Sequence, residues 1–142
     1  MSSKSVLIVD DDPDQHVLVG LYLEHAGYTV LHACDGGEGY DAAVSRRPSL
    51  VLLDMRMPRV DGEAAFRRLR SDPATREIPV VAVTADVLDW PESRSLREGF
   101  AGHVTKPCDL ARIRDVVRKV IGPAGGPMTL APGTFVVAAA MH

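Results

Sequence analysis

The sequence predicts an α/β fold, a doubly wound (βα)5 three-layer sandwich in which helices cover both faces of a parallel five-stranded sheet. Three observations lead to this prediction. Five short apolar runs, of the kind that strands buried on both faces need, alternate with segments of helical periodicity. Residues that cap helices or form turns separate these segments. The chain has 142 residues, the size of one domain with a single core.

The first strand is predicted at Val6–Val9, where every residue is apolar. A helix should come after this strand. Asp12 is a favourable N-cap, Pro13 suits the first helical position, and Gln15 lies three residues after the cap. Gly27 is expected to end this helix, because glycine readily adopts the left-handed conformation found just beyond a C-terminus.

The second strand is predicted at Thr29–Ala33, and a short helix at Glu38–Ser45 that the chain enters through Gly36 and Gly37. The third strand is Leu50–Leu53, another wholly apolar run. Such runs are typical of central strands that helices cover on both sides.

The second half of the chain repeats this alternation. Asp61 and Gly62 mark a turn before a helix from Glu63 to about Arg70, and Pro79 introduces a fourth strand, Val80–Thr84. The pattern therefore predicts one more βα unit beyond this strand.

The fourth helix should begin at Trp90–Glu92 and stop at Gly99, and Gly102–Thr105 is the fifth and weakest strand. We expect Trp90 to pack on its own domain rather than to anchor a partner. Asp109 is the expected cap of the last helix. The apolar residues of that helix recur at helical spacing: Leu110, Ile113, Val117 and Val120.

Residues 122–142 differ in character from the predicted domain at 1–121. Gly122–Pro127 is a flexible linker by composition, and the segment 128–142 is too short for an output domain. The apolar segment Phe135–Ala140 could dock on its own core, pair with a sheet edge or bind a partner; it could equally be a truncated end.

Composition excludes several classes of protein. A formal net charge of −3 gives no overall attraction to nucleic acid or to an anionic membrane. The N-terminal apolar run is too short for a signal peptide or a membrane span, so a cytoplasmic protein is expected. Cys34 and Cys108 lack the spacing of a zinc site or a disulfide framework.

Parallel sheets bind ligands outside the carboxyl ends of their strands, where the strand order reverses. In the expected order 2-1-3-4-5, this point lies between the first and third strands. Asp10 and Asp11 come directly after the first strand, and Asp54 after the apolar run of the third. Thr84 and Lys106 end the next two strands at the same edge. We therefore expect these side chains to share one crevice.

The chemistry of this crevice favours phosphoryl transfer. Adjacent carboxylates raise one another's pKa values unless a cation lies between them, and oxygen ligands in an open site suit Mg²⁺. Asp54 could then attack phosphorus, as carboxylates that form acyl phosphates do. Lys106 and Thr84 would supply the fixed cation and the hydrogen-bond donor that a transferring phosphoryl group needs.

Four motifs in one order resemble the receiver domain of two-component response regulators, in particular the single-domain, chemotaxis-type members with a flavodoxin-like fold. They are LIVDDD at 7–12, LLDMRMP at 52–58, VAVTA at 81–85 and VTKP at 104–107. The resemblance implies a signalling phosphoprotein, which catalyses only its own phosphorylation and dephosphorylation, rather than an enzyme.

The resemblance also implies roles for single residues. Asp54 would accept the phosphoryl group from a phosphohistidine. Mg²⁺ would be held by Asp11 directly, by Asp10 through water, by Asp54 and by the main-chain carbonyl of Arg56. The phosphoryl oxygens would be bound by three further groups, namely Lys106 beside a cis bond to Pro107, the Thr84 hydroxyl and the Ala85 backbone.

The sequence departs from the family pattern at the switch. An aromatic residue usually lies three positions before the lysine, where this chain has His103. An imidazole can rotate inward, but we expect an ordinary exposed polar residue here. Arg56 and Asp86 carry opposite charges at the rim, and they either pair as a lid over the acyl phosphate or remain a solvated surface pair.

The implied partners are a sensor histidine kinase or phosphotransfer protein as donor and a downstream protein at the face of the fourth helix, fifth strand and fifth helix. A phosphorylation-dependent homodimer is compatible with the resemblance, whereas direct nucleic-acid or membrane binding is not expected.

Three alternative functions share features with this sequence. One is an interaction module that is not phosphorylated, and another is a receiver fragment of a hybrid histidine kinase. The third, a phosphatase of the haloacid dehalogenase type, needs a second carboxylate where Arg56 lies, so it is disfavoured.

Overall fold

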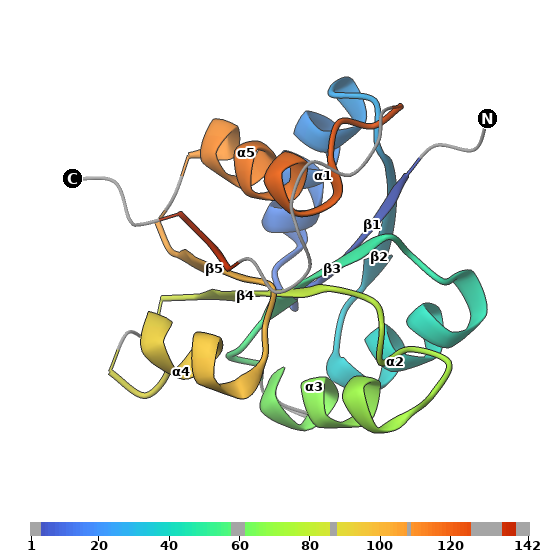
Figure 1. Cartoon of the computed structure of the whole chain (residues 1–142). Coiled ribbons are helices and arrows are strands. Elements are labelled where there is room, and N and C mark those ends of the chain that lie inside the picture. Colours follow the sequence, from blue (N-terminus) through green and yellow to red (C-terminus); the bar gives the residue numbers. More distant parts are fainter. Residues whose placement is uncertain (1–3, 58–61, 86–87, 108, 126–134, 139–142) are drawn as a thin grey trace.

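The computed structural model describes residues 4–57, 62–85, 88–107, 109–125 and 135–138 (Figure 1). Their elements, in chain order, are β1 (Ser5–Val9), α1 (Pro13–His25), β2 (Thr29–Ala33), α2 (Gly36–Arg46), β3 (Leu50–Asp54), α3 (Gly62–Ser71), β4 (Val80–Thr84), α4 (Glu92–Glu98), β5 (Gly102–Thr105), α5 (Leu110–Ile121) and β6 (Val136–Ala138). None of the helices in these ranges is long and apolar enough to cross a membrane.

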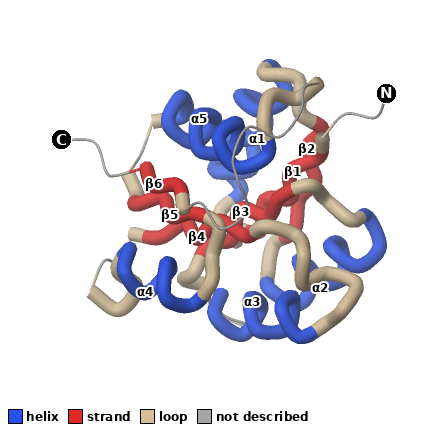
Figure 2. Tube along the Cα trace, viewed as in Figure 1, coloured by secondary structure: helices blue, strands red, loops and turns tan. Residues whose placement is uncertain are grey.

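The sheet has the order β2-β1-β3-β4-β5-β6, and every neighbouring pair is parallel. Helices α1 and α5 cover one face, and α2, α3 and α4 cover the other (Figures 1 and 2). The predicted three-layer sandwich and the order of its first five strands are confirmed. The prediction of five strands misses β6, which consists of only three residues.

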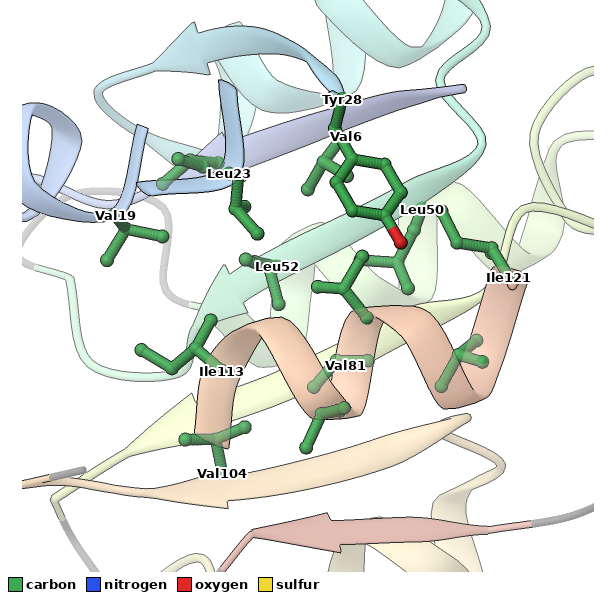
Figure 3. Packing of buried hydrophobic residues seen from close by; sticks show 14 of the residues in the cluster. Val6, Val19, Leu23, Tyr28, Leu50, Leu52, Val81, Val104, Ile113 and Ile121 are labelled. Carbon is green, nitrogen blue, oxygen red and sulfur yellow. The ribbon is translucent and has the colours of Figure 1, made fainter. Parts of the chain in front are cut away.

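The apolar runs form two cores because successive strand residues point to opposite faces. Val6 and Leu52 belong to the core beneath α1 and α5 (Figure 3). Leu7 and Leu53 belong to the core on the other face, with Phe66 of α3. Burial on both faces explains why β1 and β3 have no alternation of polar and apolar residues.

Aspartates begin three of the helices, and their side chains accept hydrogen bonds from backbone N–H groups of the first turn. Asp12 accepts from Asp14 (3.0 Å), and Asp109 accepts from Arg112 (2.8 Å). Such a cap stabilises a helix by about 1 kcal/mol. Asp35 caps α2, so this helix begins at Gly36 and the prediction that the glycines precede it is wrong.

The apolar segment near the C-terminus pairs with the sheet edge, one of the outcomes expected for it. In β6, Val136 lies opposite Gly102 and Val137 opposite His103.

Trp90 is buried against Phe100 of its own domain, as predicted. Cys34 is exposed and free, and Cys108 lies outside the described residues.

Candidate functional site

Three carboxylates meet where β1 and β3 end. Asp10 and Asp11 come directly after β1, and Asp54 is the last residue of β3. One carboxylate oxygen of each lies within 4.8 Å of the others. Asp10 and Asp54 are 5% and 7% exposed, whereas Asp11 is exposed. The structure therefore brings together the predicted acidic residues.

Backbone hydrogen bonds fix the two buried carboxylates. Oδ1 of Asp10 accepts from the N–H of Asp12 (2.9 Å), and Oδ1 of Asp54 accepts from the N–H of Arg56 (3.0 Å). These bonds occupy one oxygen of each residue. The other oxygens, Asp10 Oδ2 and Asp54 Oδ2, lie 3.3 and 3.9 Å from Nζ of Lys106.

Lys106 reaches the site from the residue directly after β5, and Thr84 ends the neighbouring strand β4. The backbone N–H of Lys106 donates to the carbonyl of Thr84 (2.9 Å), which extends the pairing of the two strands. The bond from Lys106 to Pro107 is cis, as expected from the resemblance. Thr84 is fully buried at the end of β4. Ala85, Lys106 and Pro107 line a cavity of about 370 Å³ at this edge.

The environment of Asp54 raises the pKa of its carboxyl from 3.8 to about 6. Burial is the main cause, and the negative charges of Asp10 and Asp11 act in the same direction. The N–H of Arg56 and the ammonium of Lys106 oppose this rise only in part. The carboxylates also outnumber the one ammonium beside them, so a bound cation would lower the pKa of Asp54.

The acidic cluster fits Mg²⁺ better than a transition metal. Its members offer oxygen atoms alone, and the exposed Asp11 leaves room for water ligands. Arg56 follows Asp54 by two residues and has an exposed side chain, and the role of its carbonyl as a metal ligand stays a prediction.

His103 is fully buried, so the expectation of an exposed polar residue is wrong. The β5 strand directs its imidazole beneath α4, where Nδ1 lies 2.8 Å from Oγ of Ser95. The indole N–H of Trp90 donates to the same Oγ (2.8 Å). Burial lowers the pKa of His103, and the charge of Glu92 opposes this effect. The imidazole is therefore neutral near pH 7.

The rim is only partly described. Arg56 is exposed, but Asp86 lies outside the described residues, so the predicted pair between them stays a prediction. Arg56 lines a cavity of about 380 Å³ together with Thr84 and Trp90. Arg94 borders the same cavity, and its guanidinium lies 3.9 Å from the centroid of the Trp90 ring.

Sequence reasoning missed one residue beside the acidic cluster. His16 of α1 donates its Nε2–H to the backbone carbonyl of Asp10 (2.7 Å) and thereby anchors the end of β1. Its Nδ1 lies 2.8 Å from Nδ1 of His32 on β2. The one available signal was position, since His16 lies one helical turn after the cap residue Asp12.

Comparisons with known proteins agree with this geometry. Residues 6–118 match the family described as the response regulator receiver domain. The DNA-binding dual master transcriptional regulator RpaA of Synechocystis is 39% identical, over 92% of this chain and 60% of RpaA. The chain thus spans less than two thirds of RpaA. The polar-differentiation response regulator DivK of Brucella anthropi is 33% identical, over 85% of this chain and 98% of DivK.

Solved structures show the same fold. The receiver domain of sensor histidine kinase PA1611 from Pseudomonas aeruginosa has a TM-score of 0.74 and 27% identity, over 82% of this chain and 96% of that chain. Its crystal structure has a magnesium ion coordinated in the active site cleft. The chemotaxis protein CheY4 of Vibrio cholerae has a TM-score of 0.77 and 24% identity, over 84% of this chain and 99% of that chain.

Proposed function

Because the chain belongs to the response regulator receiver domain family, we propose that it accepts a phosphoryl group on Asp54, with Mg²⁺ as cofactor. The observation that carries the proposal is the convergence of three carboxylates from two neighbouring strands beside Lys106. This arrangement combines a nucleophile, an acidic cation site and a fixed positive charge.

The residues that would hold Mg²⁺ are Asp10, Asp11, Asp54 and the carbonyl of Arg56. When bound, the ion neutralises the carboxylates and the charge of the incoming phosphoryl oxygens. Burial is the main cause of the raised pKa of Asp54, the charges of Asp10 and Asp11 add to it, and a bound cation would offset all three.

The transfer step needs an oxygen of Asp54 that can approach phosphorus. Arg56 holds Oδ1 by a backbone hydrogen bond, while Oδ2 faces Lys106, so we assign the attack to Oδ2. A phosphohistidine on the donor supplies the phosphoryl group. The new O–P bond forms as the P–N bond breaks, and the departing imidazole retains the electron pair and takes up a proton from solvent.

Three groups would then bind the transferred phosphoryl group. The ammonium of Lys106 pairs with one oxygen, and the Thr84 hydroxyl and the Ala85 backbone N–H donate to the others. Thr84 ends β4 and Ala85 follows it, and Lys106 directly follows β5, so all three groups come from the ends of two strands that pair with each other. Fixed donors of this kind stabilise the charge of a phosphoryl group.

The donor would be a sensor histidine kinase or a phosphotransfer protein, and because such phosphorylation begins from ATP we expect the reaction in the cytoplasm. We assign the output to the face of α4, β5 and α5, through a downstream protein or a phosphorylation-dependent homodimer. The buried contact between His103 and Ser95 supports this choice, since it joins β5 directly to α4.

Phosphoryl incorporation from acetyl phosphate, followed on a phosphate-affinity gel and by intact mass, tests the proposal. Wild-type protein should gain one phosphoryl group only when Mg²⁺ is present, and Asp54→Asn should gain none. Asp12→Asn is the matched control, because asparagine caps helices as well as aspartate does. Incorporation into Asp54→Asn, or none into folded wild-type protein, would refute the assignment.

A further inference from the structure

Strand β6 lies along the outer edge of β5 at one end of the sheet (Figure 2). The N–H of Val136 donates to the carbonyl of Ala101 (3.1 Å), just before β5 begins. The parallel pairing of β6 with β5 then continues along Gly102, His103 and Val104. The edge of β5 thus engages a segment that comes well after α5 in the chain.

Two side chains of this segment pack against the two cores, and a third is exposed. Val136 is 7% exposed and packs in the core beneath α1 and α5, whereas Val137 is 37% exposed. Phe135 packs against the opposite core, which contains Trp90 and Phe100. The segment is therefore held by apolar burial as well as by main-chain hydrogen bonds.

Gly102 gives the edge a shape that suits an added strand. A Cβ atom at this position would lie 2.6 Å from the carbonyl oxygen of Val136, closer than van der Waals contact permits. Its contact with Cγ2 of Val81, at 3.5 Å, would be an ordinary one. Only glycine at the start of β5 lets a neighbouring backbone approach this closely.

We propose that the outer edge of β5 is a strand-acceptor site with Phe135–Ala138 as its resident occupant. The partner that fits it presents an extended, uncharged segment rich in β-branched residues, which adds in the same parallel register after β6 leaves. The inference rests on the proposed function in one respect, namely that this edge belongs to the output face of α4, β5 and α5.

Competition within one chain is effective because a segment of the same chain acts at a high effective concentration, about millimolar when the connection is short. A partner strand must therefore bind more tightly than this internal competitor. Removing β6 from the edge should raise the affinity for such a strand without any change at Asp54.

The full-length chain offers matched variants for the test. Val136→Asp places a charge in the core and should release β6, whereas Val137→Asp alters the next, more exposed residue and is the control. Gly102→Ala changes the acceptor edge instead of the occupant. Hydrogen exchange should show a protected backbone amide at position 136 in wild type and in Val137→Asp. The amide at the same position should exchange rapidly in Val136→Asp. Rapid exchange in wild type would overturn the proposal.

A labelled peptide, FVVA with two lysines appended, then reports the affinity of the β5 edge for an added strand once β6 has left it. We expect it to bind Val136→Asp about tenfold more tightly than wild type, because the tethered competitor is gone. Adding Gly102→Ala to Val136→Asp should abolish this gain. Equal binding by wild type and Val136→Asp, or a gain that survives Gly102→Ala, would show that the edge is not a strand acceptor.

Phosphoryl incorporation by the same variants separates the two proposals. Val136→Asp should retain wild-type incorporation, since β6 is remote from the acidic cluster along the sheet. Failure of wild type to incorporate phosphate would refute the proposed function while leaving the exchange and peptide results to decide the strand-acceptor site.

Discussion

The Oγ atom of Ser95 lies 2.8 Å from Nδ1 of His103, and this contact joins α4 to β5 in the interior of the protein. Because Ser95 also accepts the N–H of Trp90, its own proton is available for Nδ1. The imidazole proton then lies on Nε2, for which the described residues provide no partner. His103 thus occupies the aromatic switch position of the family as a neutral ring with one bonded nitrogen.

Ser95→Ala should lower the free energy of unfolding by about 1–3 kcal/mol, because it leaves two buried nitrogens without their shared partner. Urea denaturation measures this change. Ser93→Ala, on the exposed side of the same helix, is the control and should differ little from wild type. Equal stability of the two variants would show that the Ser95 contacts contribute nothing.

His103→Phe should make stability less sensitive to acid. Burial lowers the pKa of His103 below 6.5, so the unfolded chain takes up a proton at this residue more readily than the folded protein does. The contribution of His103 to stability is therefore present above pH 6.5 and is lost as the pH falls. Wild type should therefore lose more stability than the variant between pH 7 and pH 5. Parallel losses in the two proteins would contradict a buried neutral imidazole.

Asp54→Asn should stabilise the metal-free protein near neutral pH. The pKa of Asp54 rises from 3.8 to about 6 on folding, so its contribution is fully present below about pH 4 and is lost as pH rises through 6. The two pKa values correspond to an upper limit of about 3 kcal/mol at pH 7. Thermal unfolding in a chelator should show the difference at pH 7 and little at pH 4.

Asp11→Asn should weaken Mg²⁺ binding by at least about tenfold, because it removes one charged ligand from an open site with few protein ligands. Isothermal titration calorimetry measures the affinity directly. Asp12→Asn keeps a helix cap outside the acidic cluster and should bind as wild type does. Similar affinities for both variants would remove Asp11 from the ligand set.

Gly62→Ala should damage both stability and the site. A Cβ atom there would lie 2.5 Å from Cα of Met55 and 2.7 Å from the carbonyl oxygen of Asp54, so the backbone beside Asp54 must shift. We expect a loss of about 1–3 kcal/mol in urea denaturation, with slower phosphoryl incorporation. Gly37→Ala meets only Oδ1 of Asp35 at 3.5 Å and should be tolerated.

The acidic edge was predictable because its signals are local. A wholly apolar run that stops at an aspartate marks both a central strand and its carboxyl end, and the pairing of β1 with β3 brings two such ends together. Strand β4 was predicted to the residue, since Pro79 precedes an uninterrupted β-rich run.

Side-chain partners across the fold were not predictable in this way. The contacts of buried His103 run through Ser95 of the preceding helix to Trp90, and neither residue carries a spacing signal in the sequence. Strand β6 depends on an edge glycine that lies far before it in the sequence. Such matches arise from tertiary packing, which overrides local preference.

Because two carboxylates share Lys106, the net charge of the site depends on which cation it binds. Three carboxylates face one ammonium, so above the pKa of Asp54 the cluster carries a net charge of −2. One divalent cation makes this pocket electroneutral, whereas a sodium or potassium ion leaves it anionic. If the chain accepts a phosphoryl group as proposed, the pocket would repel a dianionic donor without the divalent ion and would present no net charge to it with the ion bound. Cation valence would then set the rate of encounter, in addition to the rate of chemistry.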